Sequence, residues 1–350
     1  MLVAVVHNAL AQSSTPDELD VLAQVRAVTD ALHHLGHHTE VLACDLNLAS
    51  VADRLGKLKP DLIFNLVESL AGSGRLIHCF PALLDTLGMP YTGASAEALF
   101  LTSNKVLAKT RLDDRGVPTP QWVGFCGIGP GCVLPDEADR PRRWIIKSVW
   151  EHASMGLDET AIVEGMQTHL LPVMMAERAP QLGGACFAEA FIEGREFNLS
   201  LMGCHGGPKV LPPAEIIFEG FADDRPRIVD YSAKWHEESY AYHHTPRRFD
   251  FEPHETPLLA RLTAAALKCW DLFELSGYAR VDFRVDADNR PWVLEINTNP
   301  CISPDAGFAA AVERSGMTYG QAIELIVASA GLPEEKGSHF DTIHQGGGCA

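Results

Sequence analysis

The N-terminal part of the chain alternates short apolar runs with helical patterns, and this alternation restricts the fold more than any other feature. The apolar runs cover 2–7, 40–44 and 61–67, and each has the length of a buried strand. After the first run, Thr15-Pro-Asp-Glu18 is typical of a helix start, with a capping box and a proline at the first helical position. Apolar residues then recur at helical spacing at Leu19, Leu22, Val25, Val28, Leu32 and Leu35. Strands that alternate with helices predict a parallel sheet in an α/β domain.

The charge balance excludes two classes of partner. Asp and Glu number 46 against 28 Lys and Arg, a formal net charge of -18, so the surface repels phosphate backbones and anionic lipids. We therefore expect neither nucleic acid nor a membrane as a partner. No apolar run reaches the ~20 residues of a membrane span, and the first residues lack a basic leader, so a cytoplasmic protein is expected. Nine Cys residues without a C-x-x-C pair argue against a disulfide framework and a structural zinc site.

Further patterns divide the rest of the chain. Helices are expected at 80–87, 96–115 and 255–275, a strand at 144–149, and a loop at 126–143, where Gly, Pro and charged residues are frequent. Gly116-Val-Pro-Thr-Pro120 marks a domain boundary, and the polar residues from about 333 predict a disordered tail. Two histidine pairs, His33-His34 and His37-His38, lie at the end of the first helix. They could bind a metal, but solvated imidazoles near a helix C-terminus are the simpler interpretation.

A hairpin near the C-terminus carries the strongest chemical signal. A turn centred between Asp288 and Asn289 joins the runs 278–285 and 292–297. One face is then apolar, with Val281 opposite Ile296, Phe283 opposite Leu294 and Val285 opposite Trp292. On the other face Arg280 lies opposite Asn297 and Asp282 opposite Glu295.

The two carboxylates of this hairpin face repel one another unless a cation lies between them. Carboxylate and amide oxygens without Cys or His select Mg²⁺ or Mn²⁺, usually together with substrate phosphates. The alternative is a solvated face whose acids point at water. The loop 298–304 that follows the second strand is where a substrate is expected.

The hairpin motif resembles a known family. Arg280-Val-Asp282 followed by Glu295-Ile-Asn-Thr-Asn-Pro300 is similar to the metal-binding signature of the ATP-grasp ligases, in the D-alanine:D-alanine ligase branch. Four further segments match that branch in order, namely 87–93, 103–105, 116–120 and 315–319. The resemblance implies a three-domain ATP-grasp fold of α/β and α+β class. Its parts are an N-terminal parallel-sheet α/β domain at 1–100, a central α+β domain at 101–187, a C-terminal α+β domain at 188–332 with ATP between the last two, and the tail at 333–350.

The resemblance also implies residue roles for the nucleotide. Lys105 and Lys147 correspond to lysines on the phosphates, and the loop from Glu151 to Gly156 corresponds to one that closes over them through Ser154 and backbone N–H groups. His152 stands where glycine is usual. The remaining correspondences are Glu189, Phe191 and Ile192 at adenine, Glu196 at the ribose hydroxyls, and Lys234 at the transferred phosphate. Taken alone, each lysine is more often a surface residue and 189–192 an edge strand.

The implied reaction is the ATP-dependent joining of a carboxylate to an amine. ATP phosphorylates the carboxylate, the amine attacks the acyl phosphate, and the tetrahedral intermediate collapses to an amide and phosphate. Two Mg²⁺ or Mn²⁺ ions held by Asp282, Glu295 and Asn297 bridge the phosphates, and Arg280 stabilises the oxyanion. Lys234 and Ser154 complete the expected catalytic set. No side-chain nucleophile is needed, which agrees with the absence of a Ser-His-Asp or Cys-His signature.

The substrate positions depart from the family pattern. Ala153 and Trp235 replace a Ser and a Tyr, Cys301 replaces a Gly of the oxyanion hole, and Ala306 replaces a Ser that holds a carboxylate. Glu68, at the end of the third strand, is either a substrate contact or an exposed acid. Glu68, Trp235 and Cys301 are therefore the substrate candidates. Glu18 aligns loosely with a substrate-binding acid of the family, but the capping box explains it.

These departures predict a carboxylate-amine ligase for amino acids, or a similar metabolite, other than D-alanine. Within the enzyme class the alternatives are a true D-alanine:D-alanine ligase of cell-wall synthesis and a ligase of a specialised pathway. From another class, the chain could be a nucleotide-binding regulatory protein without turnover. The retained Arg280, Asp282, Glu295 and Asn297 weigh against that last alternative. Homodimers are common in the family, so a homodimer is an open expectation.

Overall fold

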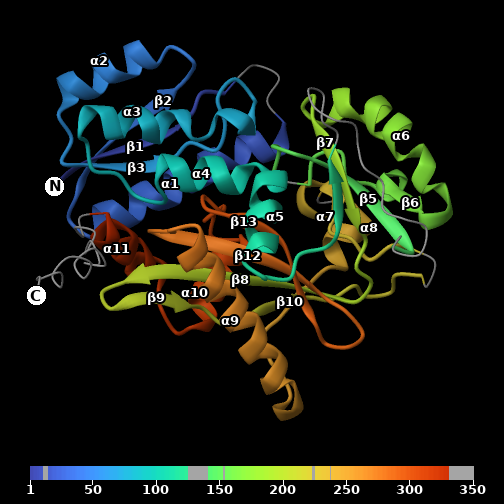
Figure 1. Cartoon of the computed structure of the whole chain (residues 1–350). Helices are drawn as coiled ribbons and strands as arrows, with labels where there is room; N and C mark the ends of the chain where they lie inside the picture. The colour runs from blue at the N-terminus through green and yellow to red at the C-terminus, as the bar shows by residue number, and fades with distance from the viewer. Residues whose placement is uncertain (11–14, 125–140, 153, 223–224, 237, 331–350) are drawn as a thin grey trace, which may run out of the picture.

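The computed structural model describes residues 1–350 except 11–14, 125–140, 153, 223–224, 237 and 331–350. The loop expected at 126–143 lies almost wholly outside the described residues, and so do Ala153 and the tail expected from 333. The described chain forms three sheets covered by helices (Figure 1).

The N-terminal sheet is parallel, as the alternating pattern predicts. Its strand order is β2-β1-β3. Val3 and Val5 of β1 pack on one side against α1 and α11, and Ala4 and Val6 pack on the other side against α2 and α3. The elements are β1 (Leu2–Asn8), α1 (Pro16–His34), β2 (His38–Cys44), α2 (Leu48–Leu58), β3 (Leu62–Leu66), α3 (Cys79–Leu87) and α11 (Tyr319–Ser329). The start of α1 has the expected capping box, in which the backbone N–H of Thr15 donates to Glu18 (2.9 Å).

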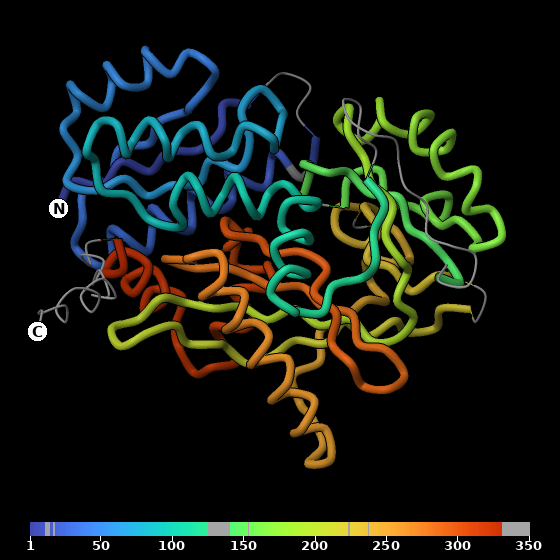
Figure 2. The backbone as a smooth tube through the Cα atoms, in the orientation of Figure 1, coloured from blue at the N-terminus to red at the C-terminus, as the bar shows by residue number. Residues whose placement is uncertain are grey.

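A second, antiparallel sheet has the order β4-β7-β5-β6. Its core joins Trp144 and Ile146 of β5 to Leu171 and Met175 of α6. The elements are β4 (Trp122–Gly124), β5 (Arg143–Ser148), β6 (Ile162–Glu164), α6 (Leu171–Arg178) and β7 (Cys186–Ala190). Figure 2 shows this green part of the chain standing beside the orange hairpin of the third sheet.

The third sheet has the order β11-β10-β8-β12-β13, with β9 paired to β8. One face packs on α4, α5 and α9 through a core that includes Phe197, Leu262 and Phe283. The strands are β8 (Arg195–Cys204), β9 (Gly207–Val210), β10 (Ala214–Ile216), β11 (Arg247–Arg248), β12 (Tyr278–Val285) and β13 (Pro291–Asn297). The helices of this part are α4 (Ala96–Ser103), α5 (Lys105–Asp114), α7 (Tyr231–Trp235), α8 (Tyr240–His243), α9 (Thr256–Leu272) and α10 (Gly307–Arg314).

The helix expected over 96–115 is wrong in one respect, because two helices occupy this range. Asn104 has an extended backbone (φ -81, ψ 95), and its side chain accepts hydrogen bonds from the N–H groups of Val106 and Leu107. An asparagine that caps a following helix competes with continuation of the preceding one. The break makes Lys105 the first residue of α5.

The predicted hairpin register is correct at one end and wrong at the other. Arg280 pairs with Asn297, Val281 with Ile296 and Asp282 with Glu295, as expected. A β-bulge then shifts the ladder, so that Phe283 pairs with Val293, Arg284 with Trp292 and Val285 with Pro291. The expected pairs of Phe283 with Leu294 and of Val285 with Trp292 do not form. The extra residue of the bulge is Leu294, which turns away from the apolar core.

The two histidine pairs do not gather at one place. His33 and His34 end α1, whereas His38 begins β2. His33 shares a hydrogen bond with Thr39 (2.7 Å), and His34 with the backbone oxygen of Asp30 (2.7 Å). In the described part of the chain no three His, Cys, Asp or Glu side chains are grouped closely enough to hold a metal ion.

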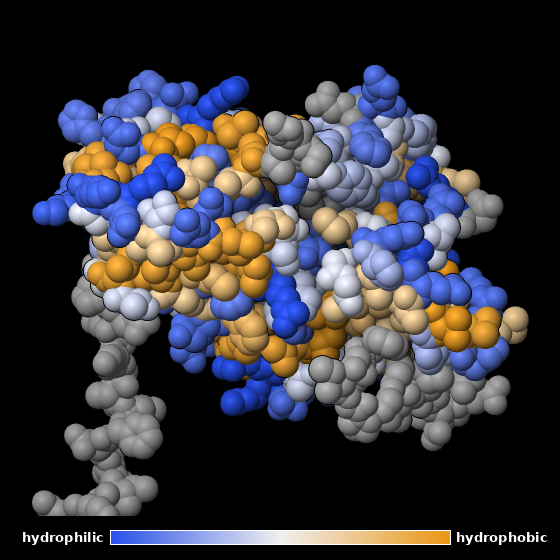
Figure 3. Space-filling model, turned by 90° about the horizontal axis from the view of Figure 1, so that it is seen from above, coloured by the Kyte–Doolittle hydropathy of each residue, from blue (hydrophilic) through white to orange (hydrophobic). Residues whose placement is uncertain are grey.

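Hydrophobic side chains gather on one face of the molecule. Figure 3 shows, from above, a band of hydrophobic residues across the left and centre of this face. The exposed large hydrophobic side chains of residues 80–110 are Leu87, Phe100 and Leu107, each 38–39% exposed. None of the described helices is long and apolar enough to span a bilayer.

Candidate active site

A cavity lies between the second and third sheets, and it collects most of the predicted nucleotide and metal residues. β5 and β7 form one wall, while β8, β12 and β13 form the other. The predicted residues that line it are Lys105, Lys147, Glu151, Ser154, Glu189, Phe191, Ile192, Glu196, Lys234, Asp282 and Glu295. Gly156, Arg280 and Asn297 are not among the lining residues, although Arg280 and Asn297 pair with one another beside it.

Apolar side chains line part of the cavity. They come from both walls and comprise Ile145, Phe191, Ile192, Ile228, Val229 and Leu294. The bulge in β13 supplies Leu294, which a regular strand would have placed in the core. Arg284 lies over the ring of Phe191 (5.4 Å to the centroid) and donates to the backbone oxygens of Ile192 and Arg227. A flat aromatic group fits between such walls.

A buried carboxylate orders two lysines deeper in the cavity. Glu189 lies 2.5 Å from Nζ of Lys109 and 2.6 Å from Nζ of Lys147. Burial alone would raise the pKa of Glu189, but the two ammonium groups lower it, so the carboxylate is ionised. The Glu189 side chain is therefore committed to the lysines, and it fixes the ammonium group of Lys147 at the cavity wall.

Lys109 is a site residue that our sequence analysis missed. It is 1% exposed, donates to Thr119 (2.7 Å) and does not line the cavity itself. Lys105 and Lys109 lie four residues apart and thus on the same face of α5. A lysine pair at this spacing beside apolar neighbours is a signal that could have indicated a buried, charge-paired helix face.

Lys105 of α5 contacts both the loop after β5 and the hairpin. Its Nζ donates to the backbone oxygen of Glu151 (2.7 Å) and lies 3.7 Å from Oε2 of Glu295. Burial would raise the pKa of Glu295, but Lys105, His152, Lys234 and Arg280 together hold it well below its usual range. Glu295 is therefore an ionised carboxylate with the cationic side chains of Lys105, Lys234 and Arg280 near it.

The hairpin face next to Glu295 is also ordered by ion pairs. Arg280 donates to both oxygens of Asp282 (2.7 and 2.8 Å), and the amide of Asn198 donates to Oδ1 of Asp282 (2.7 Å). Asn297 accepts a hydrogen bond from the backbone N–H of Asn299 (3.1 Å). The donor set of Asp282, Glu295 and Asn297 offers only oxygen atoms, with both carboxylates in register on one face. This chemistry fits a hard divalent cation.

The remaining predicted nucleotide residues have defined local roles. Glu196 pairs with Arg284 (3.1 Å), and burial raises its pKa. Ser154 has a left-handed backbone (φ 61) and donates to the backbone oxygen of Val229 (2.8 Å). Gly156 has a left-handed backbone (φ +65) that glycine adopts without strain, and a Cβ there would lie 2.5 Å from Cδ2 of Leu182. Lys234 lies on α7, and burial lowers its pKa.

His152 is the most unusual member of the cavity wall. Burial, assisted by the charge of Lys105, lowers its pKa to about 4, so the imidazole is neutral at pH 7. Its Nδ1 is inaccessible to solvent and has no hydrogen-bond partner in the described structure. The sequence identified this position only as a departure from a usual glycine.

Two of the three substrate candidates lie together, at the carboxyl end of β3. Glu68 accepts a hydrogen bond from Gln24 of α1 (2.8 Å), whose side-chain oxygen accepts from the N–H of Ile302 (3.1 Å). The thiol of Cys301 lies 2.9 Å from Asp20 and donates to it, because burial first, and then neighbouring acids, raise its pKa well above the usual value. Trp235, the third candidate, ends α7 directly after Lys234.

Asp20 and Gln24 are further residues that the sequence analysis missed. Asp20 also accepts from the hydroxyl of Ser303 (3.0 Å to each oxygen), and Gln24 is 1% exposed. Both side chains lie one turn apart on the face of α1 that contacts the loop after β13. Two polar residues at helical spacing within an apolar face were the available signal.

Comparison with known proteins agrees with this geometry. Residues 143–328 match the family model described as the D-ala D-ala ligase C-terminus. The chain is 30% identical over 308 residues to the uncharacterized protein y4sG of Sinorhizobium fredii, covering 86% of this chain and 85% of that one. It is 29% identical over 309 residues to a D-alanine--D-alanine ligase of Moorella thermoacetica, covering 86% and 91%.

The fold agrees with solved structures as well. The D-alanine--D-alanine ligase of Bacillus anthracis complexed with ATP superposes with a TM-score of 0.72 at 19% identity, covering 94% of this chain and 97% of that one. The structure of the ligase from Coxiella burnetii gives a TM-score of 0.68 at 19% identity, covering 94% and 93%. Sequence and fold thus lead to one conclusion, that this chain belongs to the D-alanine--D-alanine ligase-like family of ATP-grasp ligases.

Proposed function

We propose that the protein joins a carboxylate to an amine with ATP as the phosphoryl donor, and that its substrates are amino acids, or similar metabolites, other than D-alanine. The observation that carries the ligase proposal is the cavity itself. Five charged side chains from five separate segments line one cavity between two sheets. They are three lysines (Lys105, Lys147 and Lys234) and two ionised carboxylates (Glu189 and Glu295), and apolar side chains lie next to them. Such an arrangement serves to hold a nucleotide with its phosphates directed at the hairpin.

Each residue of the cavity has a proposed role that follows from its position. In this proposal Phe191, Ile192 and Leu294 contact the base. Glu196, which lines the same cavity, accepts hydrogen bonds from the ribose hydroxyls. Lys105 and Lys147 bind phosphate oxygens, while Glu189 fixes the direction of Lys147. Ser154 and Lys234, which also line the cavity, contact the transferred phosphate. These contacts place the phosphoryl group next to the incoming carboxylate, so catalysis rests on positioning and charge compensation.

The hairpin supplies the remaining groups. Asp282, Glu295 and Asn297 would hold two Mg²⁺ or Mn²⁺ ions. When bound, these ions would neutralise the charge that develops on the phosphates. Arg280, held in place by Asp282, directs its guanidinium toward the oxyanion that forms when the amine attacks the acyl phosphate.

The substrate end supports a substrate other than D-alanine. Trp235 brings a large side chain next to Lys234, and Cys301 is fixed to Asp20 on α1. Ala306 caps α10 without a hydroxyl to offer. A site of altered size and hydrogen-bonding groups selects different substrates by the same reaction.

The test measures the release of ADP and phosphate with MgATP, first with D-alanine and then with a panel of D- and L-amino acids, with products identified by mass spectrometry. We expect an amide product from a pair other than two D-alanines. D-alanyl-D-alanine as the preferred product would restore the activity named for the relatives and refute the substrate proposal. ATP binding without any amide product would instead favour a nucleotide-binding regulator.

A homodimer is the partner that the resemblance implies. The exposed Leu87, Phe100 and Leu107 support an association through this part of the surface. Light scattering of the purified protein at two concentrations tests it.

A further inference from the structure

Arg284 of β12 contacts three other segments that surround the cavity. Its Nε donates to the backbone oxygen of Ile192 (2.9 Å), in the segment between β7 and β8. Its Nη1 donates to the backbone oxygen of Arg227 (2.9 Å), in the segment between β10 and α7, and to Oε2 of Glu196 on β8 (3.1 Å). Arg284 and Glu196 are also directly paired across the two strands, so their side chains project to the same face of the sheet. One guanidinium thus links four segments of the cavity wall.

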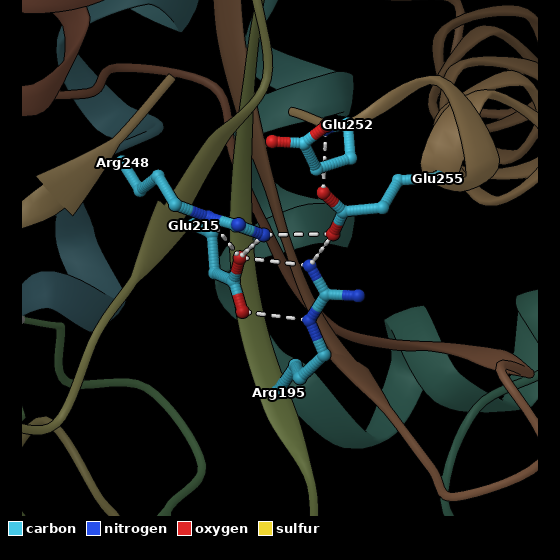
Figure 4. Close-up of polar contacts among 5 residues, drawn as sticks. All are labelled: Arg195, Glu215, Arg248, Glu252 and Glu255. Carbon is cyan, nitrogen blue, oxygen red and sulfur yellow. Dashed lines mark hydrogen bonds and ion pairs between the residues drawn. The ribbon is translucent and has the colours of Figure 1, made fainter. Parts of the chain in front are cut away.

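The burial of Arg284 distinguishes it from two arginines of the same sheet that also pair with carboxylates. The side chains of Arg195 and Arg248 are 31% and 35% exposed, so water can reach the nitrogens that their acidic partners leave free (Figure 4). Arg284 lines the cavity but is only 3% exposed, and its Nη2 has no hydrogen-bond partner in the described structure. Burial of a guanidinium with an unpaired donor costs stability. This cost favours a role of Arg284 in ligand binding over a role in folding alone.

Glu196 depends on Arg284 for its position. Among the described residues, no other side chain lies within hydrogen-bond or ion-pair distance of the Glu196 carboxylate. Burial raises the pKa of Glu196, and the charge of Arg284 acts in the opposite direction, toward the ionised form. An ionised carboxylate only accepts hydrogen bonds, and the two neighbouring hydroxyls of a ribose are donors that match its two oxygens. Arg284 therefore holds Glu196 as an acceptor at a fixed place on the cavity wall.

We propose that Arg284 is a positioning residue for the nucleotide, which acts by fixing Glu196 relative to the backbone of Ile192. With both groups fixed by one guanidinium, the site selects a nucleotide with two ribose hydroxyls over a deoxynucleotide. The resemblance on which the other site residues depend implies no role for Arg284. The inference deepens the proposed function and rests on it, because it takes the cavity to be a nucleotide site.

The test measures binding by calorimetry with the full chain and MgCl₂. The probes are ADP, 2′-deoxy-ADP and 3′-deoxy-ADP, whose binding requires no turnover. We expect the wild type to bind ADP about 10-fold or more tightly than at least one deoxy analogue. Arg284→Met retains the apolar part of the side chain. It should weaken ADP binding by about 10-fold and the binding of that analogue by no more than about 2-fold. A general loss of folding or of base binding would weaken all three nucleotides alike, so the preference for ribose is the informative quantity.

Arg143→Met is the matched control. Arg143 and Arg284 both lie over the ring of Phe191, at 4.8 and 5.4 Å from its centroid. Arg143, however, pairs with Glu193 (2.8 Å) and does not line the cavity. Arg143→Met should therefore retain the wild-type preference for ADP over the deoxy analogues.

Two further experiments test whether Arg284 acts through Glu196. In a Glu196→Gln background, Arg284→Met should change the preference for ribose by no more than about 2-fold, because the group that Arg284 positions is already altered. Arg284→Lys should retain only part of the preference, since an ammonium keeps the charge but lacks the planar fork that contacts Ile192 and Glu196 together. Arg284→Lys carries the test by itself should Arg284→Met fail to fold.

The proposal is overturned if the Arg284 variants keep the wild-type preference for ADP, if they lose affinity for all three nucleotides equally, or if the wild type binds all three with equal affinity. Any of these results together with an amide product would leave the ligase function standing. A preference for ribose that depends on Arg284, without an amide product from any amino acid, would support the assignment of Arg284 and refute the ligase function.

Discussion

The two faces of the third sheet use charge in opposite ways. On the face toward α9, Arg195, Glu215, Arg248 and Glu255 form a closed network with contacts of 2.5–2.9 Å (Figure 4). The cavity face also has close pairs, Arg280 with Asp282 and Arg284 with Glu196, but the lysines that reach it from α5 and α7 are not closely paired there. Lys105 lies 3.7 Å from Glu295, and Lys234 makes no ion pair within the described residues. Charges that satisfy one another stabilise the fold, whereas charges held apart are available to a ligand. Four substitutions test whether this division is real.

Glu295→Gln should have the largest effect and should confine it to activity. Glutamine lacks the negative charge of Glu295 and is a weaker ligand for the proposed metal ion, so turnover should fall by about 10⁴-fold. ATP binding should weaken by no more than about 10-fold, because the lysines and the apolar side chains of the cavity remain. Steady-state ADP release and calorimetry measure the two quantities. Glu313→Gln, on the exposed side of α10, is the matched control. Turnover within 10-fold of wild type would contradict the role of Glu295.

Lys109→Met tests a buried charge next to the cavity. Lys109 is fully buried behind the cavity and contacts Glu189, which lines it. Its loss leaves Glu189 with Lys147 as its only cation, and we expect the lost charge-assisted hydrogen bond to reduce the unfolding free energy by about 3 kcal/mol. Chemical denaturation measures the loss, with the exposed Lys268→Met as control. If Lys109→Met unfolds with the wild-type free energy, the Lys109–Glu189 pair does not stabilise the fold.

Glu255→Gln tests the closed network. Burial alone would raise the pKa of Glu255. Hydrogen bonds from the backbone N–H of Glu252 and from Arg248 and Arg195 have the larger effect and lower it to about 2. A lowered carboxyl pKa stabilises the fold above pH 4.5, and this contribution is lost as the pH falls from 4.5 toward 2. The variant should lose about 2 kcal/mol at pH 7 and less at pH 3, with turnover unchanged. A stability difference that is the same at both pH values would show that the charge of Glu255 is not what matters.

Asn198→Ala should have the smallest effect, on the cavity face. Asn198 orders Asp282 through one hydrogen bond of 2.7 Å, while Arg280 still holds both carboxylate oxygens. We expect turnover to fall about 10-fold and the unfolding free energy to change by less than about 1 kcal/mol. The reverse pattern, lost stability with full turnover, would place Asn198 with the structural network.

Local patterns explain why some of these features could be predicted from the sequence. Period-two alternation is sufficient to place Arg280, Asp282, Glu295 and Asn297 on one face, and the structure has them in that register. Apolar runs and the capping box likewise suffice for the N-terminal sheet and α1. Each of these signals is contained within about 20 residues of chain.

The missed features depend on contacts between distant segments. Lys109 is explained by Glu189, and Asp20 by Cys301 and Ser303, which lie more than 280 positions away. The bulge was not predictable from alternation either, because leucine suits both the core and the apolar part of the cavity. Such residues carry no local signal beyond helical spacing or hydrophobicity.

The bulge at Leu294 also limits how this gene can change in length. A one-residue insertion or deletion on the turn side of the bulge, between Asp286 and Pro291, alters a loop whose geometry already tolerates irregularity. A one-residue insertion or deletion between Leu294 and Asn297 would reverse the faces of Glu295 and Ile296. The carboxylate would then be buried in the core, and the aliphatic side chain would face the cavity. In a library of single-codon length variants, active clones should therefore be recovered from the turn and be absent from the four codons that end β13.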